Sequence, residues 1–112
     1  MLEDPNDPHA LQVVTSTEGD QGVVSARGEL DANSARHLRD ACDEVFAQGQ
    51  VALVLDLAGI TFIDSSGLSV LIHAYKQAGE RDGSLTLRSP SAAVNRLLEM
   101  TGQSDRFLGP EA

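Results

Sequence analysis

The sequence contains almost no cysteine and few aromatic residues, and both shortages limit what the chain can be. Its 112 residues include one cysteine, Cys42, so no disulfide can form within the chain. Aromatic residues make up 4% and tryptophan is absent, so the core must consist mainly of Leu, Val, Ile and Ala. No His/Cys cluster offers the several ligands that a metal site needs. We therefore expect one aliphatic domain with no metal.

Basic residues are also scarce. Eight Lys and Arg stand against seventeen Asp and Glu, which gives a formal net charge of −9. Such a surface repels nucleic-acid phosphates and anionic lipid headgroups, so we expect no direct binding to nucleic acid. A basic or polar protein surface is the more natural partner, although solubility alone explains the charge equally well.

A long apolar run is missing too. No stretch approaches the roughly 20 apolar residues of a membrane helix, so no membrane insertion is expected. The N-terminal MLEDPNDPHA carries acid and proline where a signal peptide has basic and apolar residues. No Walker loop or glycine-rich phosphate fingerprint occurs; no cofactor is predicted, and nucleotide binding stays open. These absences favour a cytoplasmic protein, with a flexible polar tail over 1–10 and a single domain over 11–112.

What the sequence does contain is an alternation of hydrophobic periods, which predicts an α/β fold. Two Val- and Thr-rich runs separated by EGDQG predict an opening hairpin, and the apolar VALVLDL predicts a strand buried on both faces. Right-handed crossovers would make the later strands parallel, so we expect a mixed four- to five-stranded sheet with helices packed beside it. The expected elements are strands over 11–17 and 22–30, a helix over Asn33–Gln48, a strand over Val51–Leu57, a helix over Ser66–Ala78, a strand over Ser84–Arg88, a helix over 89–102 and a short strand over 105–108.

Capping residues predict where the helices begin and end. Asp31 or Asn33 is expected to cap the first helix, and Gly49 to follow its last turn. Gly79 is expected to end the second helix, and Ser89 to cap the third.

The junction between the third strand and the second helix carries the polar cluster Asp64-Ser65-Ser66-Gly67. Open α/β sheets gather functional groups where the chain leaves the carboxyl end of a strand. Asp and Ser are good N-caps, but one such residue is enough for a helix. Capping therefore explains one of the three polar residues and leaves the cluster unexplained.

A nucleophilic serine is one explanation of the cluster. The hydrolase elbow needs Gly-x-Ser-x-Gly, and here Ile63 and Asp64 stand two residues before the two serines. His73 lies eight residues past Ser65, or about 12 Å along a helix axis, which is too far to accept its proton. The remaining histidines fall in the tail and on a polar helix face. No catalytic triad can be assembled, so we expect no enzymatic activity.

A modified serine is the other explanation. A phosphoryl group at a helix N-terminus meets free N–H donors and the positive end of the helix dipole, so the fold should tolerate it. The dianion would repel an acidic or apolar partner surface. Such a serine would act as a binding switch without a change of fold.

Three segments resemble a known family. GELDANSARHL and VLDLAGITFIDSSGLSVLIHAYKQ are similar to the STAS domain, specifically to stand-alone anti-sigma factor antagonists. SPSAAVNRLLEMTGQSDRF resembles the usual ending of those proteins. The likeness spans roughly residues 11–108 with the motifs in order, and it implies a STAS-like fold. Ser69 stands where many members have Gly.

The resemblance implies a regulatory function. Such antagonists bind an anti-sigma factor that is also a serine kinase, and this binding frees the sigma factor. The kinase phosphorylates the first hydroxyl after the Asp, here Ser65, and a serine phosphatase removes the phosphate. Asp31 would match the acidic residue close to that serine, and Asp64, Ser66 and Gly67 complete the neighbours of the switch.

A second function remains open, that of a STAS accessory subunit docked on a membrane transporter complex. The intact Asp-Ser-Ser-Gly favours the antagonist, because docking alone requires no phospho-acceptor.

Several polar residues also have structural explanations. Asp31 is equally plausible as a helix cap, and Ser66 is expected to be an N-terminal hydrogen bonder and not a second acceptor. Cys42 falls on the apolar helix face and is expected in the core, with a redox role as the minor alternative. Asp56 is expected near the end of its strand, bonded to a neighbouring backbone group.

Overall fold

The computed structural model describes residues 9–108, and its helices and strands follow the predicted order as far as the third helix. In chain order they are β1 (Gln12–Glu18), β2 (Gln21–Leu30), α1 (Ala35–Ala47), β3 (Ala52–Ile63), α2 (Ser65–Glu80), β4 (Ser84–Arg88), α3 (Ala92–Met100) and α4 (Ser104–Leu108). Most of the expected polar tail and the last four residues lie outside the described range. The division into a tail over 1–10 and one domain over 11–112 therefore stays a prediction.

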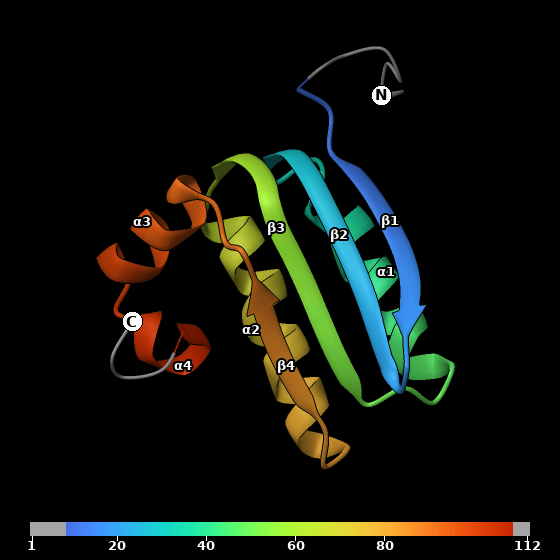
Figure 1. Cartoon of the computed structure of the whole chain (residues 1–112). Helices are drawn as coiled ribbons and strands as arrows, with labels where there is room; N and C mark the ends of the chain where they lie inside the picture. Colours follow the sequence, from blue (N-terminus) through green and yellow to red (C-terminus); the bar gives the residue numbers. More distant parts are fainter. Residues whose placement is uncertain (1–8, 109–112) are drawn as a thin grey trace.

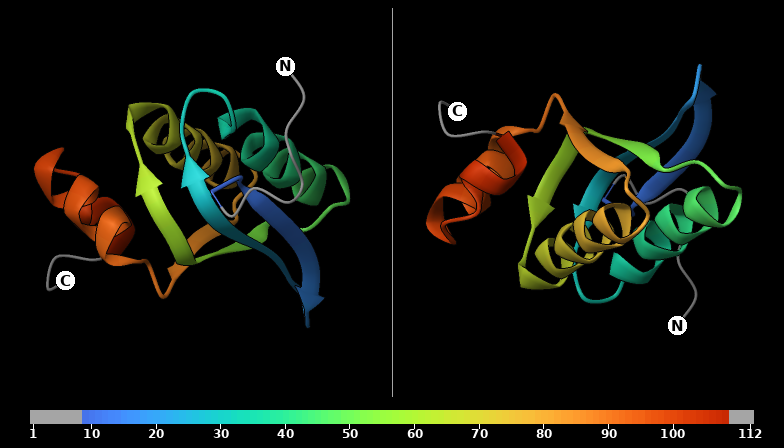
Figure 2. Two further views of the ribbon diagram at one scale, coloured as in Figure 1. Left: turned by 90° about the horizontal axis from the view of Figure 1, so that it is seen from above. Right: turned by 90° about the horizontal axis from the view of Figure 1, so that it is seen from below.

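The strands form one mixed sheet in the order of the chain, β1-β2-β3-β4 (Figure 1). The predicted hairpin is the antiparallel pair of β1 and β2, whereas β2–β3 and β3–β4 are parallel. Both parallel connections step in the same direction, so right-handed crossovers place their helices on the same face. Figures 1 and 2 show α1 and α2 side by side on that face, and α3 and α4 at the β3–β4 side away from α1.

The core between the sheet and these helices is aliphatic, as expected. Cys42 is 1% exposed within it, and burial raises the pKa of its thiol to about 12. The thiol therefore stays neutral, as a small apolar core residue should. The largest fully buried side chains are those of Val24, Leu30, Leu38, Cys42, Leu53, Leu55, Leu57, Ile60, Leu71, Val94 and Leu98.

β3 is longer than the strand predicted over Val51–Leu57, because it stays paired with β2 up to the match of Leu30 with Ile63. Asp56 consequently lies inside β3, and its expected place near the strand's end is wrong. Its expected bond to the backbone is confirmed, because Oδ1 accepts the N–H of Ala58 at 3.1 Å.

Two predicted helix boundaries are also wrong. Ser91, and not Ser89, caps α3, and its hydroxyl accepts a first-turn N–H at 3.3 Å. α2 continues through Gly79 to Glu80. Gly49 does follow the last turn of α1, with the positive φ of +92° that favours glycine.

The segment 105–108 is helical, so the predicted last strand is wrong. It belongs to α4, where the ring of Phe107 meets that of Tyr75 edge-on at a centroid distance of 5.7 Å. A helical turn directs Phe107 onto α2, and this packing outweighs the weak strand preference of so short a segment.

Within residues 9–108, no helix combines the length and the apolarity needed to span a membrane. In the same part of the chain, no three His, Cys, Asp or Glu side chains gather in a way that could hold a metal ion.

Candidate functional site

β2 and β3 end side by side at the edge of the sheet where the polar cluster lies. Leu30, the last residue of β2, pairs with Ile63, the last residue of β3. The N–H of Asp64 donates to the carbonyl of Leu30 at 3.2 Å, so Asp31 and Asp64 leave the sheet as neighbours. The structure thus brings Asp31 to the cluster, as the prediction requires.

Asp64 is the N-cap of α2. Its Oδ1 accepts the N–H of Ser66 at 2.9 Å and that of Gly67 at 3.3 Å. Two donors that we expected to be free for a phosphate are therefore already bonded to a carboxylate. A phosphoryl group on Ser65 would gain the helix dipole but would stand beside this negative charge.

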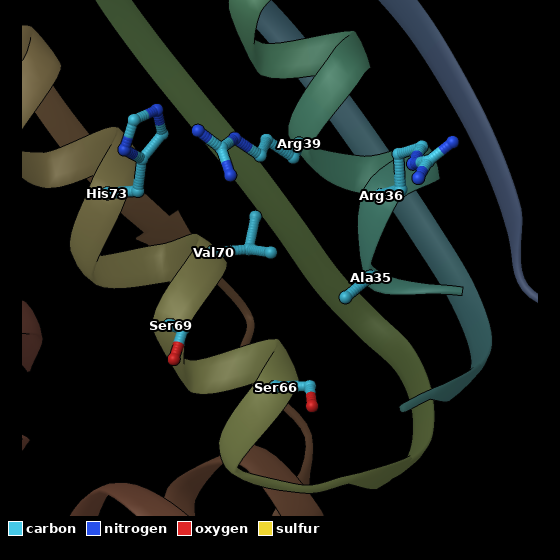
Figure 3. Close-up of a pocket in the computed structure, with 7 residues that line it drawn as sticks. All are labelled: Ala35, Arg36, Arg39, Ser66, Ser69, Val70 and His73. Carbon is cyan, nitrogen blue, oxygen red and sulfur yellow. The ribbon is translucent and has the colours of Figure 1, made fainter. Parts of the chain in front are cut away.

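The two hydroxyls of the cluster differ in accessibility. Ser65 is the first residue of α2 and is exposed, and within residues 9–108 its hydroxyl makes no hydrogen bond. Ser66 is half-buried and turns towards α1 (Figure 3), while its backbone N–H is bonded to Asp64. An external enzyme could therefore reach Ser65 more easily than Ser66.

Gly67 allows α2 to start against both strand ends. It is buried, and a Cβ added to it would lie 2.7 Å from Cγ1 of Ile63 and 2.7 Å from Cγ of Leu30. These separations are far below van der Waals contact. The glycine of the motif is thus explained by packing.

Asp31 shapes the turn that leads into α1. Its Oδ1 accepts the N–H of Asn33 at 3.0 Å and that of Ser34 at 3.2 Å. Ser34 is 5% exposed, and its hydroxyl donates to the Glu29 carbonyl at 2.9 Å and accepts the N–H of Asp31 at 3.0 Å. Asp31 therefore organises the turn before α1 and also lies next to Asp64. The predicted capping of α1 by Asp31 or Asn33 is wrong, because the carboxylate of Asp31 bonds within this turn and Ser34, which was not identified from the sequence, holds the N-cap position.

A groove of about 350 Å³ runs between α1 and α2 and begins beside the cluster; we call it the α1–α2 groove (Figure 3). Arg39 reaches from α1 towards His73 on α2. Nε2 of His73 lies 3.8 Å from Oδ1 of Asp43, so this histidine is engaged with α1 and not with Ser65. The residues lining the groove are Ala35, Arg36, Arg39, Ser66, Ser69, Val70 and His73.

The groove was not predicted from the sequence, although the spacing of its residues along each helix indicates a shared face. Arg36 and Arg39 are three residues apart, and Ser66, Ser69 and His73 are spaced by three and four. Such spacings place side chains on one face of a helix.

The fold and the cluster together define a class of protein: small α/β domains with an exposed serine at a helix N-terminus. Residues 13–109 match the family model described as Mlab, STAS domain. The chain belongs to the STAS domain family.

Individual relatives extend this assignment. The chain is 35% identical to the anti-sigma-B factor antagonist of Listeria monocytogenes over 82 residues, which cover 73% of this chain and 72% of that one. An anti-sigma factor antagonist from Mycobacterium paratuberculosis has a similar crystal structure, with a TM-score of 0.77 at 30% identity, covering 90% of this chain and 86% of that one. The phosphorylated form of Bacillus SpoIIAA gives a TM-score of 0.68 over 88% of this chain and 89% of that one, at 20% identity, which shows the fold alone. The predicted STAS fold and the resemblance to stand-alone antagonists are confirmed.

Proposed function

We propose that this chain is an anti-sigma factor antagonist that binds an anti-sigma factor with serine kinase activity and thereby frees a sigma factor. Phosphorylation of Ser65 ends the binding, and a serine phosphatase restores it. The protein acts in the cytoplasm as a binding protein and not as an enzyme. The proposal rests on the exposed hydroxyl of Ser65 at the start of α2, which makes no hydrogen bond within residues 9–108, in a chain whose relatives are antagonists.

The switch works through charge. A phosphoryl group adds about −1.5 to −2 units at pH 7. It would do so beside the carboxylate of Asp64, which already accepts the N–H groups of Ser66 and Gly67. A partner that covers Ser65 must then desolvate this charge, and each 1.4 kcal/mol of lost binding energy is about a tenfold loss of affinity. The fold survives, because nothing in residues 9–108 hydrogen-bonds to the Ser65 hydroxyl.

Docking on a transporter complex is the weaker candidate. It requires no accessible hydroxyl at the helix start, and the curated relatives are antagonists.

A pull-down with mass spectrometry of both the bound proteins and the Ser65 peptide would identify the kinase. With the purified kinase, Ser65→Ala should abolish phosphate incorporation and retain binding, whereas Ser66→Ala should remain a substrate. Phosphorylation that persists in Ser65→Ala and vanishes in Ser66→Ala would overturn the site.

A further inference from the structure

The α1–α2 groove is a basic site on an acidic protein. Arg36 and Arg39 are exposed, and neither makes a hydrogen bond or ion pair with any residue in 9–108. Two of the eight basic side chains thus line one groove without a partner among residues 9–108, although the net charge of the chain is −9. Four other arginines are engaged by Gln12, by Glu18 or by an aromatic ring: Arg27, Arg88, Arg81 and Arg106.

The groove offers hydrogen-bond donors and an open side. Arg39 points across it towards His73, and Ser66 contributes a hydroxyl that has no bond within residues 9–108 (Figure 3). The carboxylate that lies near this histidine is that of Asp43, at 3.8 Å. Guanidinium groups bind carboxylates through paired, charge-assisted hydrogen bonds. An Asp or Glu side chain therefore suits the groove.

We propose that the α1–α2 groove receives an acidic segment of the protein partner, with separate carboxylates bound by Arg36 and by Arg39 while the partner covers Ser65. The identity of this partner as the kinase rests on the proposed function. Because most of the surface is acidic, an acidic segment is repelled elsewhere and attracted here. The groove thus fixes the orientation in which the partner docks.

The same placement explains how one phosphate could act on an already acidic surface. Ser65 directly precedes Ser66, which lines the groove. A phosphoryl group on Ser65 adds negative charge where the acidic segment enters, so it repels the segment and competes for the arginines.

The groove can be tested without the kinase. We would titrate the isotope-labelled full chain with a short peptide of alternating Glu and Ser, using the Gln/Ser peptide as its neutral match. The acidic peptide alone should shift the backbone amide NMR signals of Arg36, Arg39, Ser66 and Ser69, and salt should weaken the effect. Arg36→Glu with Arg39→Glu should abolish it. Arg96→Glu, which reverses an exposed charge on α3, should not.

Equal shifts with both peptides, or an equal loss in Arg96→Glu, would overturn the proposal. If ATP shifts these signals and the acidic peptide does not, the groove is a nucleotide-binding site and not a docking site for an acidic segment. Self-association in sedimentation that disappears in the double variant would make the groove an interface between copies of this chain.

A second experiment measures binding to the purified kinase. Calorimetry should show that the double variant binds it about tenfold or more weakly, with a smaller salt dependence. If the double variant binds the kinase with wild-type affinity while Ser65→Glu binds poorly, docking at the groove is rejected and the proposed function stands. If the acidic peptide binds at the groove but no kinase phosphorylates the chain, the proposed function is rejected and the acidic docking site stands.

Discussion

Asp31 and Asp64 each follow the last residue of a strand, and each uses one carboxylate oxygen to accept the N–H groups two and three residues further on. After Asp31, the hydroxyl of Ser34 turns inward and is bonded to the backbone. After Asp64, the hydroxyl of Ser65 stays exposed and unbonded within the described residues. The carboxylate organises the backbone at both junctions, so at the second one a serine is left free for modification without loss of structure.

The difference between the junctions at Asp31 and Asp64 is tested most strongly by adding charge at the second one. Ser65→Glu should fold like the wild type, since its hydroxyl bonds to nothing in residues 9–108, and should bind the kinase at least about a hundredfold more weakly. Ser84→Glu is the matched control, because it adds the same charge to an exposed serine on β4. Calorimetric binding and thermal unfolding measure both effects. Equal affinities of Ser65→Glu and the wild type would argue against a charge switch.

Removing the hydroxyl at each junction should have unequal effects on stability. Ser34→Ala leaves the Glu29 carbonyl and the Asp31 N–H without their buried partner, and should cost about 2 kcal/mol. Ser65→Ala should change the free energy of unfolding by less than about 0.5 kcal/mol. Urea denaturation of the two variants gives the comparison. Similar losses would mean that the Ser65 hydroxyl has a structural role.

Gly67 tests how tightly the second junction is packed. Gly67→Ala should lose about 1 kcal/mol net, because overpacking against Leu30 and Ile63 costs about 2 kcal/mol and the helix regains about 1 kcal/mol. Gly79→Ala, in the same helix with nothing within 4 Å of the new Cβ, should instead stabilise the protein by about 0.5–1 kcal/mol. Thermal unfolding distinguishes the signs. A stabilising Gly67→Ala would contradict the packing explanation.

An effect that appears only at high pH concerns Cys42 in α1, which is buried where Ser65 is exposed. The folded thiol has its pKa raised to about 12, whereas the unfolded thiol ionises near its ordinary pKa of about 8.5. Its contribution to stability is therefore complete below about pH 8.5 and is lost as the pH rises towards 12. Relative to Cys42→Ala, the wild type should lose about 1 kcal/mol between pH 7 and pH 9.5 in denaturant titrations. Parallel pH profiles of stability for the wild type and Cys42→Ala would mean that the thiol ionises equally in the folded and unfolded states.

Much of the fold was predictable because the hydrophobic period changes at each junction. The predicted strand Ser84–Arg88 coincides with β4, and the predicted helix Ser66–Ala78 lies within α2. The segment 105–108 was too short to show a period, and the contact of Phe107 with Tyr75 helps to set its conformation. Nothing local in the sequence indicates that contact.

The site was predictable where local chemistry sets it. An Asp before a helix is a good cap, and Asp64 caps α2. The buried position of Ser34 was not predictable, because it depends on where the Glu29 carbonyl lies. The α1–α2 groove needs two helices to pack in one register, and helical spacing alone does not show that Arg39 faces His73.

The order of strands in the sheet has a consequence for synthesis. Each strand pairs with its neighbours in the chain, so a growing chain can add every new strand to the edge just made. No strand has to be inserted between two others, which keeps the contacts comparatively local. Both junctions lie between Asp31 and Gly67, ahead of β4, α3 and α4. The ribosome therefore releases the edge of the domain that carries Asp31 and Ser65 before the strand and helices that complete the fold.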